Sequence, residues 1–409
     1  MKYGRNLLLL LLACASVCAG LPATEKAREQ ESARPKAVEV PIISNPRVPK
    51  YPSRRIAFKE DLTVGVKEGD ENSMFGERVY FNVDGDGNIF VTDWDRKRIQ
   101  KYGPDGKYLL TIGRKGQGPG EFQNVWEPEF DKEGNLYVVD IAQKRISFFG
   151  RDGRYLRQIG FPMVNISGSL YFDALGYFLM AVDEIREEGE QGARWDSVVG
   201  LYDDKFQPLE VFHRESHEIK TSGGQDEDSI AKSLAASMSD SAFKPAPHYL
   251  LAPDGEIFFG FSRTYEIKVY SLEGKPVRIV RKDYDPAPVT AQDKEQFEDI
   301  QRAEFLRFLP AKAENATKKA LRLILYPKYK PAYQSFTVAD DGWLFVIVEN
   351  RGSETTVLDV FDAEGRYLAR TEAPIPSEGL RFKNGKAYAI ATKEGFKSVK
   401  RYTYTVPGN

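Results

Sequence analysis

The sequence predicts an all-β fold, a six-bladed β-propeller of four-stranded antiparallel blades. A block of 27 residues beginning at Gly87 recurs without a gap at Gly134, an offset of 47. Turns that contain glycine divide each copy into short apolar segments of strand length, and four more diverged copies follow. A unit repeated at this period is typical of solenoids and propellers, and four strands joined by tight turns make one propeller blade.

The first copy defines the expected order of elements within a blade. Its elements are strand 79–83, turn 84–88, strand 89–92, loop 93–97, strand 98–102, turn 104–106 and strand 108–112. The six copies are expected to start near residues 79, 125, 170, 248, 333 and 379. The last copy lacks one strand before the chain ends, and residues 54–66 form a strand-like segment without a blade. We expect this N-terminal strand to complete the sixth blade, because closing the ring removes free sheet edges.

Two insertions interrupt the period of the propeller, which we expect over residues 54–409. The segment 216–247 is polar with a helical piece at 230–241, and 285–330 predicts a pair of helices between blades 4 and 5. Thr290 with Asp293 three residues later is typical of a helix N-terminus. Apolar stripes follow at helical spacing, Phe297, Ile300, Phe308 and Leu309 before Pro310, then Ala316, Ala320, Leu321, Ile324 and Leu325. This pair is either a lid over the channel or a packing element without a ligand role.

The N-terminus carries a targeting signal over residues 1–20. Lys2 and Arg5 precede a leucine run that is too short to span a bilayer permanently. Cys14 could be lipidated as in a bacterial lipobox, or the signal could be cut after Ala19. Both alternatives predict export to the periplasm or the cell surface, an outer-membrane lipoprotein being one form. Residues 21–53 are rich in charge, proline and alanine and predict an extended tether.

Composition excludes several classes of partner and chemistry. The net charge is −2, so no global field attracts nucleic acid or an anionic membrane, and membrane attachment is expected only through the anchor. The two cysteines, Cys14 and Cys18, both lie within the signal, so packing and not disulfides must hold the mature chain together. We expect a monomer without a cofactor.

Metal and nucleophile motifs are weak. The three histidines are His213, His217 and His248, too few for a histidine-rich metal centre, although His213 and His217 could share a helix face. Residues 84–88 resemble half of a calcium loop but lack the terminal bidentate glutamate, which favours a hairpin turn. The chain contains no Gly-x-Ser-x-Gly motif. We therefore predict no metal site.

The candidate ligand-binding residues lie where the two clear copies differ. The repeated pairs Asp93/Asp140 and Arg98/Arg145 are interpreted as structural, bonding turn amides or each other. Loop residues beside them are expected to line one mouth of the central channel. These candidates are Trp94, Asp95, Gln143 and Lys144.

The blocks GNIFVTDWDRKRIQKYGPDGKYLLTIG and GNLYVVDIAQKRISFFGRDGRYLRQIG resemble NHL-repeat propellers. The glycine-rich connector 113–128 resembles the link between such blades. As a whole the chain is similar to exported bacterial six-bladed β-propellers of unassigned function. The resemblance implies the fold, whereas lyases, lactonases, sensor domains and adhesive modules all occur on it.

Two functions stay open. The first is a non-enzymatic binding or scaffolding module whose loop face holds a protein, peptide or glycan. The alternative is a lyase or hydrolase acting on a small ligand in the central channel, with calcium held by backbone carbonyls and Asp as an option. Carboxylates or histidines that converge in the channel would favour the enzyme, and a channel filled by Phe and Leu would exclude it.

Overall fold

The computed structural model describes residues 39–53, 55–161, 165–173, 175–189, 192–220, 226–308, 314–350 and 354–405. The predictions about the signal, Cys14, the cut after Ala19, Leu309 and Pro310 lie outside these ranges. The chain forms two compact units. One is a ring of β-sheets made of Ile42–Thr221, Pro245–Ala287 and Lys330–Asn409, and the other contains the helices of Ser222–Lys244 and Pro288–Tyr329.

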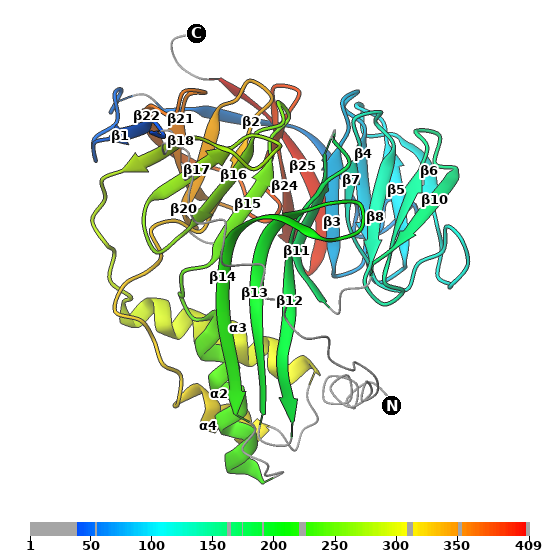
Figure 1. Cartoon of the computed structure of the whole chain (residues 1–409). Helices are drawn as coiled ribbons and strands as arrows, with labels where there is room; N and C mark the ends of the chain where they lie inside the picture. Colours follow the sequence, from blue (N-terminus) through cyan, green and yellow to red (C-terminus); the bar gives the residue numbers. More distant parts are fainter. Residues whose placement is uncertain are drawn as a thin grey trace, which may run out of the picture. The chain divides into compact units, whose positions relative to one another are not determined.

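Blades 1 and 2 are the two clear sequence copies (Figure 1). Their strands are β3 (Val79–Val83), β4 (Ile89–Asp93), β5 (Arg98–Tyr102) and β6 (Tyr108–Ile112), then β7 (Val125–Phe130), β8 (Leu136–Asp140), β9 (Arg145–Phe149) and β10 (Tyr155–Gly160). Each blade is a four-stranded antiparallel sheet whose strands pair in chain order. Strand β7 carries an irregularity between Val125 and Pro128. Because β7 is an edge strand of its sheet, it tolerates the proline.

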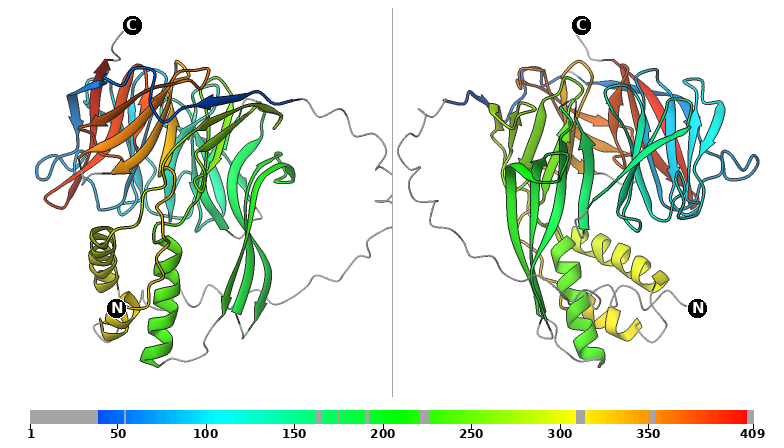
Figure 2. Two further views of the ribbon diagram at one scale, coloured as in Figure 1. Left: turned by 90° about the vertical axis from the view of Figure 1, so that its left-hand side faces the viewer. Right: turned by 45° about the vertical axis from the view of Figure 1, so that its right-hand side comes forward.

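Blade 3 has much longer strands than the sequence predicts. They are β11 (Asn165–Phe172), β12 (Phe178–Gly189), β13 (Gly192–Tyr202) and β14 (Pro208–Lys220), drawn as long arrows in Figure 2. The strands expected at 177–182 and 198–202 therefore continue outward, and the insertion begins after Lys220, not at Ser216.

Cross-strand pairs explain this extension of a charged sequence. Arg186 pairs with Asp196 at 2.9 Å and Arg214 with Glu184 at 2.7 Å, so the charges stabilise the sheet. His217 stacks on Trp195 of the neighbouring strand. The expectation that His213 and His217 could share a helix face is wrong, because both lie on β14.

Blades 4 and 5 follow the predicted pattern, with one added strand. Blade 4 contains β15 (Pro247–Leu251), β16 (Ile257–Phe261), β17 (Glu266–Tyr270) and β18 (Pro276–Lys282), and blade 5 contains β19 (Ser335–Val338), β20 (Leu344–Asn350), β21 (Thr356–Phe361) and β22 (Tyr367–Ala373). The added strand is β1 (Ile42–Asn45), which pairs in parallel with β18 and makes blade 4 five-stranded. The tether expected over 21–53 is therefore corrected, because its last part is built into the sheet.

The segment between β1 and β2 follows the outer edges of the blades. The side chain of Asn45 is buried, donates to the carbonyl of Gly365 at 2.9 Å and accepts from the amide of Tyr367 at 2.7 Å, which joins blade 4 to blade 5. The amides of Lys50 and Tyr51 then donate to carbonyls of β22. The N-terminal chain thus contacts blades 4 and 5 before β2 (Ala57–Val64) closes the ring in blade 6.

Blade 6 confirms the predicted closure. Its strands β23 (Arg381–Lys383), β24 (Lys386–Lys393) and β25 (Phe396–Thr405) pair in order, and β2 (Ala57–Val64) lies antiparallel to β25 as the fourth strand. The two-residue turn Asn384–Gly385 has φ of +51° and +67°, the conformation that tight hairpins prefer. Six blades of four antiparallel strands, with β1 added to blade 4, confirm the predicted fold class.

The apolar core lies between blades. Every hydrophobic cluster of the described propeller residues joins two neighbouring blades, for example Phe345 of blade 5 stacked on Phe382 of blade 6 at a ring separation of 3.7 Å. Both faces of each sheet are thereby buried, which explains why strands such as β4 and β8 are buried along their whole length.

One buried ionic network lies between blades 4 and 5. Asp359 is fully buried and accepts hydrogen bonds from Tyr265 (2.8 Å), Tyr367 (2.6 Å) and Arg370 (2.7 and 2.8 Å). The ammonium of Lys282, also buried, lies 3.7 Å from the same carboxylate. Buried charge of this kind is tolerated because hydrogen bonds satisfy it completely.

The two insertions form a single helical unit, which the sequence did not predict. Its helices are α2 (Glu227–Ser241), α3 (Ala291–Phe308) and α4 (Glu314–Leu321). The capping interaction is confirmed, since the amide of Thr290 donates to Asp293 at 2.8 Å and the amide of Asp293 donates back at 3.2 Å. Helices α2 and α4 share an apolar cluster of Ala235, Met238, Ala242, Ala320, Leu321 and Ile324.

The apolar stripes of this unit are partly confirmed. Ala316, Ala320 and Leu321 are buried, whereas Ile300 is 57% exposed and Leu325 is 76% exposed. Among the described helices, none is long and apolar enough to cross a membrane.

Candidate functional site

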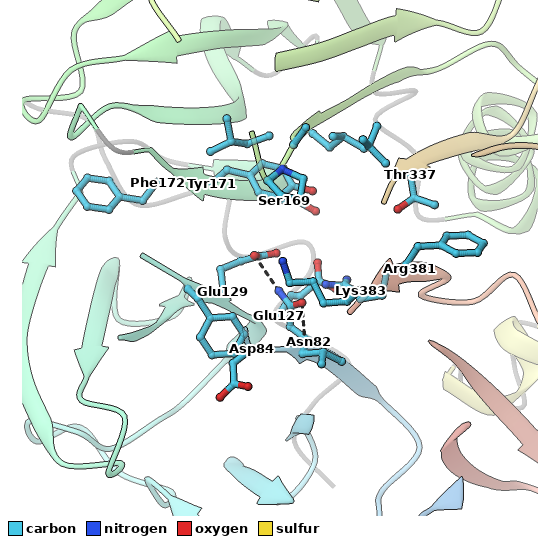
Figure 3. A pocket seen from close by; sticks show the side chains of 18 of the residues that line it. Asn82, Asp84, Glu127, Glu129, Ser169, Tyr171, Phe172, Thr337, Arg381 and Lys383 are labelled. Atoms are coloured by element: carbon cyan, nitrogen blue, oxygen red, sulfur yellow. Dashed lines mark hydrogen bonds and ion pairs between the residues drawn. The ribbon is translucent and has the colours of Figure 1, made fainter. Parts of the chain in front are cut away.

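A cavity of about 740 Å³ occupies the centre of the ring (Figure 3). All six blades line it through their first strands, β3, β7, β11, β15, β19 and β23, and through the turns that follow these strands. The channel is therefore open and not filled by Phe and Leu. Its size is within the range of about 300–1,000 Å³ that is usual for small-ligand sites.

Four polar side chains converge on this cavity. Glu127 and Glu129 lie two residues apart on β7, Asn82 comes from β3 and Arg381 from β23, and Figure 3 shows them pointing toward one another. The guanidinium of Arg381 is paired with Glu127. The amide of Asn82 donates to Oε2 of Glu129 at 2.9 Å. The pairing register of β7 shifts between Val125 and Pro128, so Glu127 lies within this irregularity and Glu129 follows it. Irregularities of this kind often orient side chains beside functional sites.

The two glutamates differ in their environment. Burial raises the pKa of Glu129 to about 8, and the neighbouring charge of Glu127 adds to the effect, while Arg381 and Asn82 offset part of it. Glu129 is thus largely a neutral carboxylic acid at pH 7 and can donate a hydrogen bond. Glu127 holds the cation. Perturbed carboxyl groups in a cavity are typical of functional sites.

The charges around the cavity nearly cancel. Its described lining contains five acidic and four basic residues, and protonation of Glu129 makes the two numbers equal. Lys383 at the rim is paired with Asp340 at 2.7 Å. Within the part of the chain that the structure describes, the Nε of Arg381 is buried and has no hydrogen-bond partner.

Hydroxyl groups and aromatic rings complete the wall. Tyr171 lies across the cavity from the glutamates in Figure 3. Burial raises the pKa of its hydroxyl well above the usual value, and the charges of Glu129 and Glu127 add to this effect. Tyr249 donates to the carbonyl of Ser169 at 2.7 Å, which fixes its ring beside Tyr171. Thr337 faces the cavity from blade 5. The site therefore offers hydrogen-bond donors, acceptors and an apolar surface without excess charge.

Trp94 and Asp95 lie outside this cavity. They belong to the loop between β4 and β5, at the opposite end of the blade from the turns that line it. Asp95 accepts hydrogen bonds from the amides of Glu77 (2.7 Å) and Arg78 (3.0 Å). The ring of Trp94 lies between the cations of Arg78 and Lys97, at 3.1 and 3.2 Å from its centre. These contacts organise the loop, and a ligand role for both residues stays a prediction.

Gln143 and Lys144 also lie at that opposite end. The side-chain amide of Gln143 donates to the carboxylate of Asp140 at 2.6 Å and to the backbone carbonyl of Glu121 at 3.2 Å. Lys144 adopts a left-handed backbone conformation with φ of +49° in the turn before β9. Neither residue is part of the larger cavity lining.

The structural interpretation of the repeated residues is confirmed. Asp140 accepts from the amides of Gln123 (2.7 Å) and Asn124 (3.0 Å), and Asp93 pairs with Arg96 at 2.9 Å. Arg145 binds carbonyls of the connector at 2.7 Å. In the hairpin 84–88, Asp84 accepts from backbone amides of its own turn, as expected of a turn.

The described ranges contain no cluster of side chains that could bind a metal ion. Among them, no group of three or more His, Cys, Asp or Glu side chains is arranged to hold a metal ion. The three histidines lie apart from the glutamates, on β14 and β15, and none lines either cavity.

The comparisons agree with this architecture. A family model for DUF5128, described as a 6-bladed beta-propeller, matches residues 81–232. The chain is similar to a candidate exported protein of Bacteroides fragilis at 12% identity and a TM-score of 0.51, over 89% of this chain and 99% of that one. No curated protein matches it.

Two further solved structures are more distant. A DUF4221 member from Bacteroides vulgatus has 9% identity and a TM-score of 0.47, over 86% of this chain and 99% of that one. Virginiamycin B lyase from Staphylococcus aureus has 10% identity and a TM-score of 0.42, over 85% and 99%. At such identities the likeness concerns the fold alone. The chain is a six-bladed β-propeller, and its chemistry must be argued from its own cavity.

Proposed function

We propose that this protein is an exported binding module that holds a short, electrically neutral glycan in its central channel. The observation that carries the proposal is the cavity of about 740 Å³, which all six blades line and in which Glu127–Arg381 and Asn82–Glu129 meet. A cavity of this volume suits a small ligand better than a folded protein.

The hydrogen-bonding groups favour a polyhydroxylated ligand. A sugar hydroxyl both donates and accepts, and the cavity is lined by Glu127, which accepts, by Arg381, which donates, and by protonated Glu129, which can do both. A strongly charged ligand would find no net charge to pair with, because the charges of the lining cancel at neutral pH. Tyr171 and Tyr249 add aromatic surface for the apolar faces of a sugar ring.

Export is supported by the sequence of residues 1–20 and by the fold shared with a candidate exported protein of Bacteroides fragilis. A lipid on Cys14 would keep the propeller at the membrane surface, where extracellular glycans are accessible. Labelling cells with radioactive palmitate tests this point: Cys14→Ser should lose the label and Cys18→Ser should retain it.

Calorimetric titration of the purified chain with neutral di- and trisaccharides tests the binding function. We expect one-to-one binding that Glu129→Leu weakens at least about tenfold, because a buried hydrogen bond to a polar ligand is worth about 1–3 kcal/mol. The matched control is Glu394→Leu, an exposed glutamate on a surface turn, which should bind as the native chain does. A peptide that binds in place of every glycan would overturn the glycan assignment.

A second candidate function is hydrolysis of that glycan. The favouring observation is a neutral carboxyl group, Glu129, two residues from a second glutamate, the combination that general acid–base catalysis uses. Glu129 would give its proton to the leaving oxygen, and Glu127 would accept a proton from the attacking water. Release of reducing ends by the native chain, lost in Glu129→Gln while binding persists, would favour the enzyme. If the native chain releases no reducing ends, the hydrolase is excluded and the binding function remains.

A further inference from the structure

A second, smaller cavity of about 170 Å³ adjoins the first. The two cavities share Glu127, Glu129, Tyr137 and Ser169, so the carboxyl groups stand at the boundary between them. The remaining lining comes from the first strands of blades 1 to 3, β3, β7 and β11, and from β8, the second strand of blade 2. A ligand bound in the channel against the glutamates would therefore present a substituent to this side pocket.

The side pocket is mainly apolar behind its polar entrance. Trp126, Val139 and Leu170 contribute apolar surface, and the rings of Tyr80 and Tyr137 add to it. Val139 and Leu170 belong to the buried cluster between blades 2 and 3, which makes these walls rigid. Water gains few hydrogen bonds in such a space, so an apolar group that displaces it gains affinity.

The volume limits the substituent. A water-sized group occupies roughly 30 Å³, so the pocket holds about five such groups. An acetamido group, which consists of an amide and one methyl, fits within this number. A complete pyranose ring with its hydroxyls is about twice as large and does not fit.

The entrance matches an amide in particular. The carboxylate of Glu127 can accept the amide N–H, and the neutral acid of Glu129 can donate to the carbonyl oxygen. The methyl group would then lie against Trp126 and Leu170. A plain hydroxyl at the same carbon would leave the apolar walls unfilled.

We propose that this side pocket receives the N-acetyl group of an acetamido sugar, so that the channel selects N-acetylated glycans. This inference rests on the proposed glycan-binding function and deepens it. It makes Trp126 and Leu170 specificity-determining residues, not contributors to general affinity.

The test compares sugars that differ in the acetamido group, N,N′-diacetylchitobiose against cellobiose and N-acetylgalactosamine against galactose, by calorimetric titration. We expect a preference of at least about tenfold for the acetylated member in one pair. Leu170→Phe, which fills the pocket, should reduce the preference to about twofold and leave affinity for the unacetylated sugar within about twofold. Leu209→Phe, at an exposed leucine of the same blade, is the control and should leave the preference unchanged.

The outcomes separate the two proposals. Equal affinities for both members of each pair, weakened together by Glu129→Leu, would overturn the side pocket and retain the glycan channel. Binding of none of these sugars nor of the wider glycan panel would overturn both. If Leu170→Phe fails to fold, as a lost melting transition would show, Trp126→Ala takes its place, and an unchanged preference in that variant would contradict the inference.

Discussion

Replacing Asp359 by asparagine tests whether ionic contacts hold blades 4 and 5 together. Its buried carboxylate accepts hydrogen bonds from Tyr265, Tyr367 and Arg370 and lies 3.7 Å from Lys282. Asparagine keeps the shape but removes the charge and turns one acceptor into a donor. Two cations and two hydroxyl groups then face a neutral amide.

The cost can be worked out from these contacts. Removing one partner of a buried ion pair costs about 3–5 kcal/mol, and the lower end applies because Arg370 is partly exposed. Unfolding entropy is roughly 2.1 cal/mol/K per residue, or ~0.7 kcal/mol/K for the roughly 350 residues that the structure describes, so about 3 kcal/mol lowers the melting temperature by about 4 °C. Glu364→Gln, which removes an exposed pair with Arg366, should cost less than about 0.5 kcal/mol.

Thermal melting at neutral and acid pH completes the test. Burial alone would raise the pKa of Asp359, but the hydrogen bonds and charge of Arg370, the charge of Lys282 and the hydrogen bond from Tyr367 lower it overall. A lowered pKa contributes stability that is present above the ordinary aspartate pKa of about 3.9 and is lost as the pH falls through the folded-state value. The difference in melting temperature between the native chain and Asp359→Asn should therefore become smaller at acid pH. A variant that melts within about 1 °C of the native chain at pH 7, or a gap that does not change with pH, would refute the reasoning.

Three further predictions concern closure, the connector and the channel. Removing residues 1–66, and with them β2, should abolish the cooperative unfolding transition in circular dichroism. Removing residues 1–48, and with them β1, should only lower the melting temperature. A native-like melt after removal of residues 1–66 would contradict ring closure. Gly113→Ala should cost about 1–2 kcal/mol or more, since its φ is +72° and a Cβ would meet a phenylalanine ring, while Gly85→Ala in open space should be near neutral; equal melts would count against this. Glu129→Gln should have a higher melting temperature than the native chain, and this difference should grow from pH 5 to pH 8. The reason is that the raised pKa of Glu129 in the folded state makes its ionisation destabilise the native chain, whereas glutamine does not ionise. A difference that does not change with pH would contradict the burial of this carboxyl group.

The architecture could be predicted closely from the sequence because the turns mark it. Blade starts expected near 79, 125, 248 and 333 coincide within two residues with β3, β7, β15 and β19. The N-terminal strand could be assigned because a blade lacked one. The long strands of blade 3 could not be predicted, because their sequence is charged and the pairs that stabilise them, such as Arg186 with Asp196, form only across the folded sheet.

The polar centre of the channel was missed for a physical reason. Glu127 lies near the end of the glycine-rich connector predicted over 113–128, and Glu129 follows it directly, at the start of the second copy expected near 125. We did not consider this junction as a place for ligand-binding residues. Yet Glu129 and Asn82 are 47 residues apart, occupy equivalent positions in neighbouring blades and bond to each other. The rule that functional positions are those at which the copies differ applies here, on the first strand of each blade. We applied it to the loop of Trp94 and Asp95, which lies at the other end.

The central claim is that a neutral glycan binds beside Glu129 in its protonated form. Calorimetric titration of the best-binding oligosaccharide at pH 6.5 and pH 9 into the native chain, Glu129→Gln and Glu129→Leu tests it most directly. We predict that the native chain loses affinity at pH 9 as Glu129 ionises and that the glutamine variant binds equally at both pH values. The leucine variant should bind at least about tenfold more weakly than the native chain at pH 6.5. Native-like binding by Glu129→Leu would contradict the account.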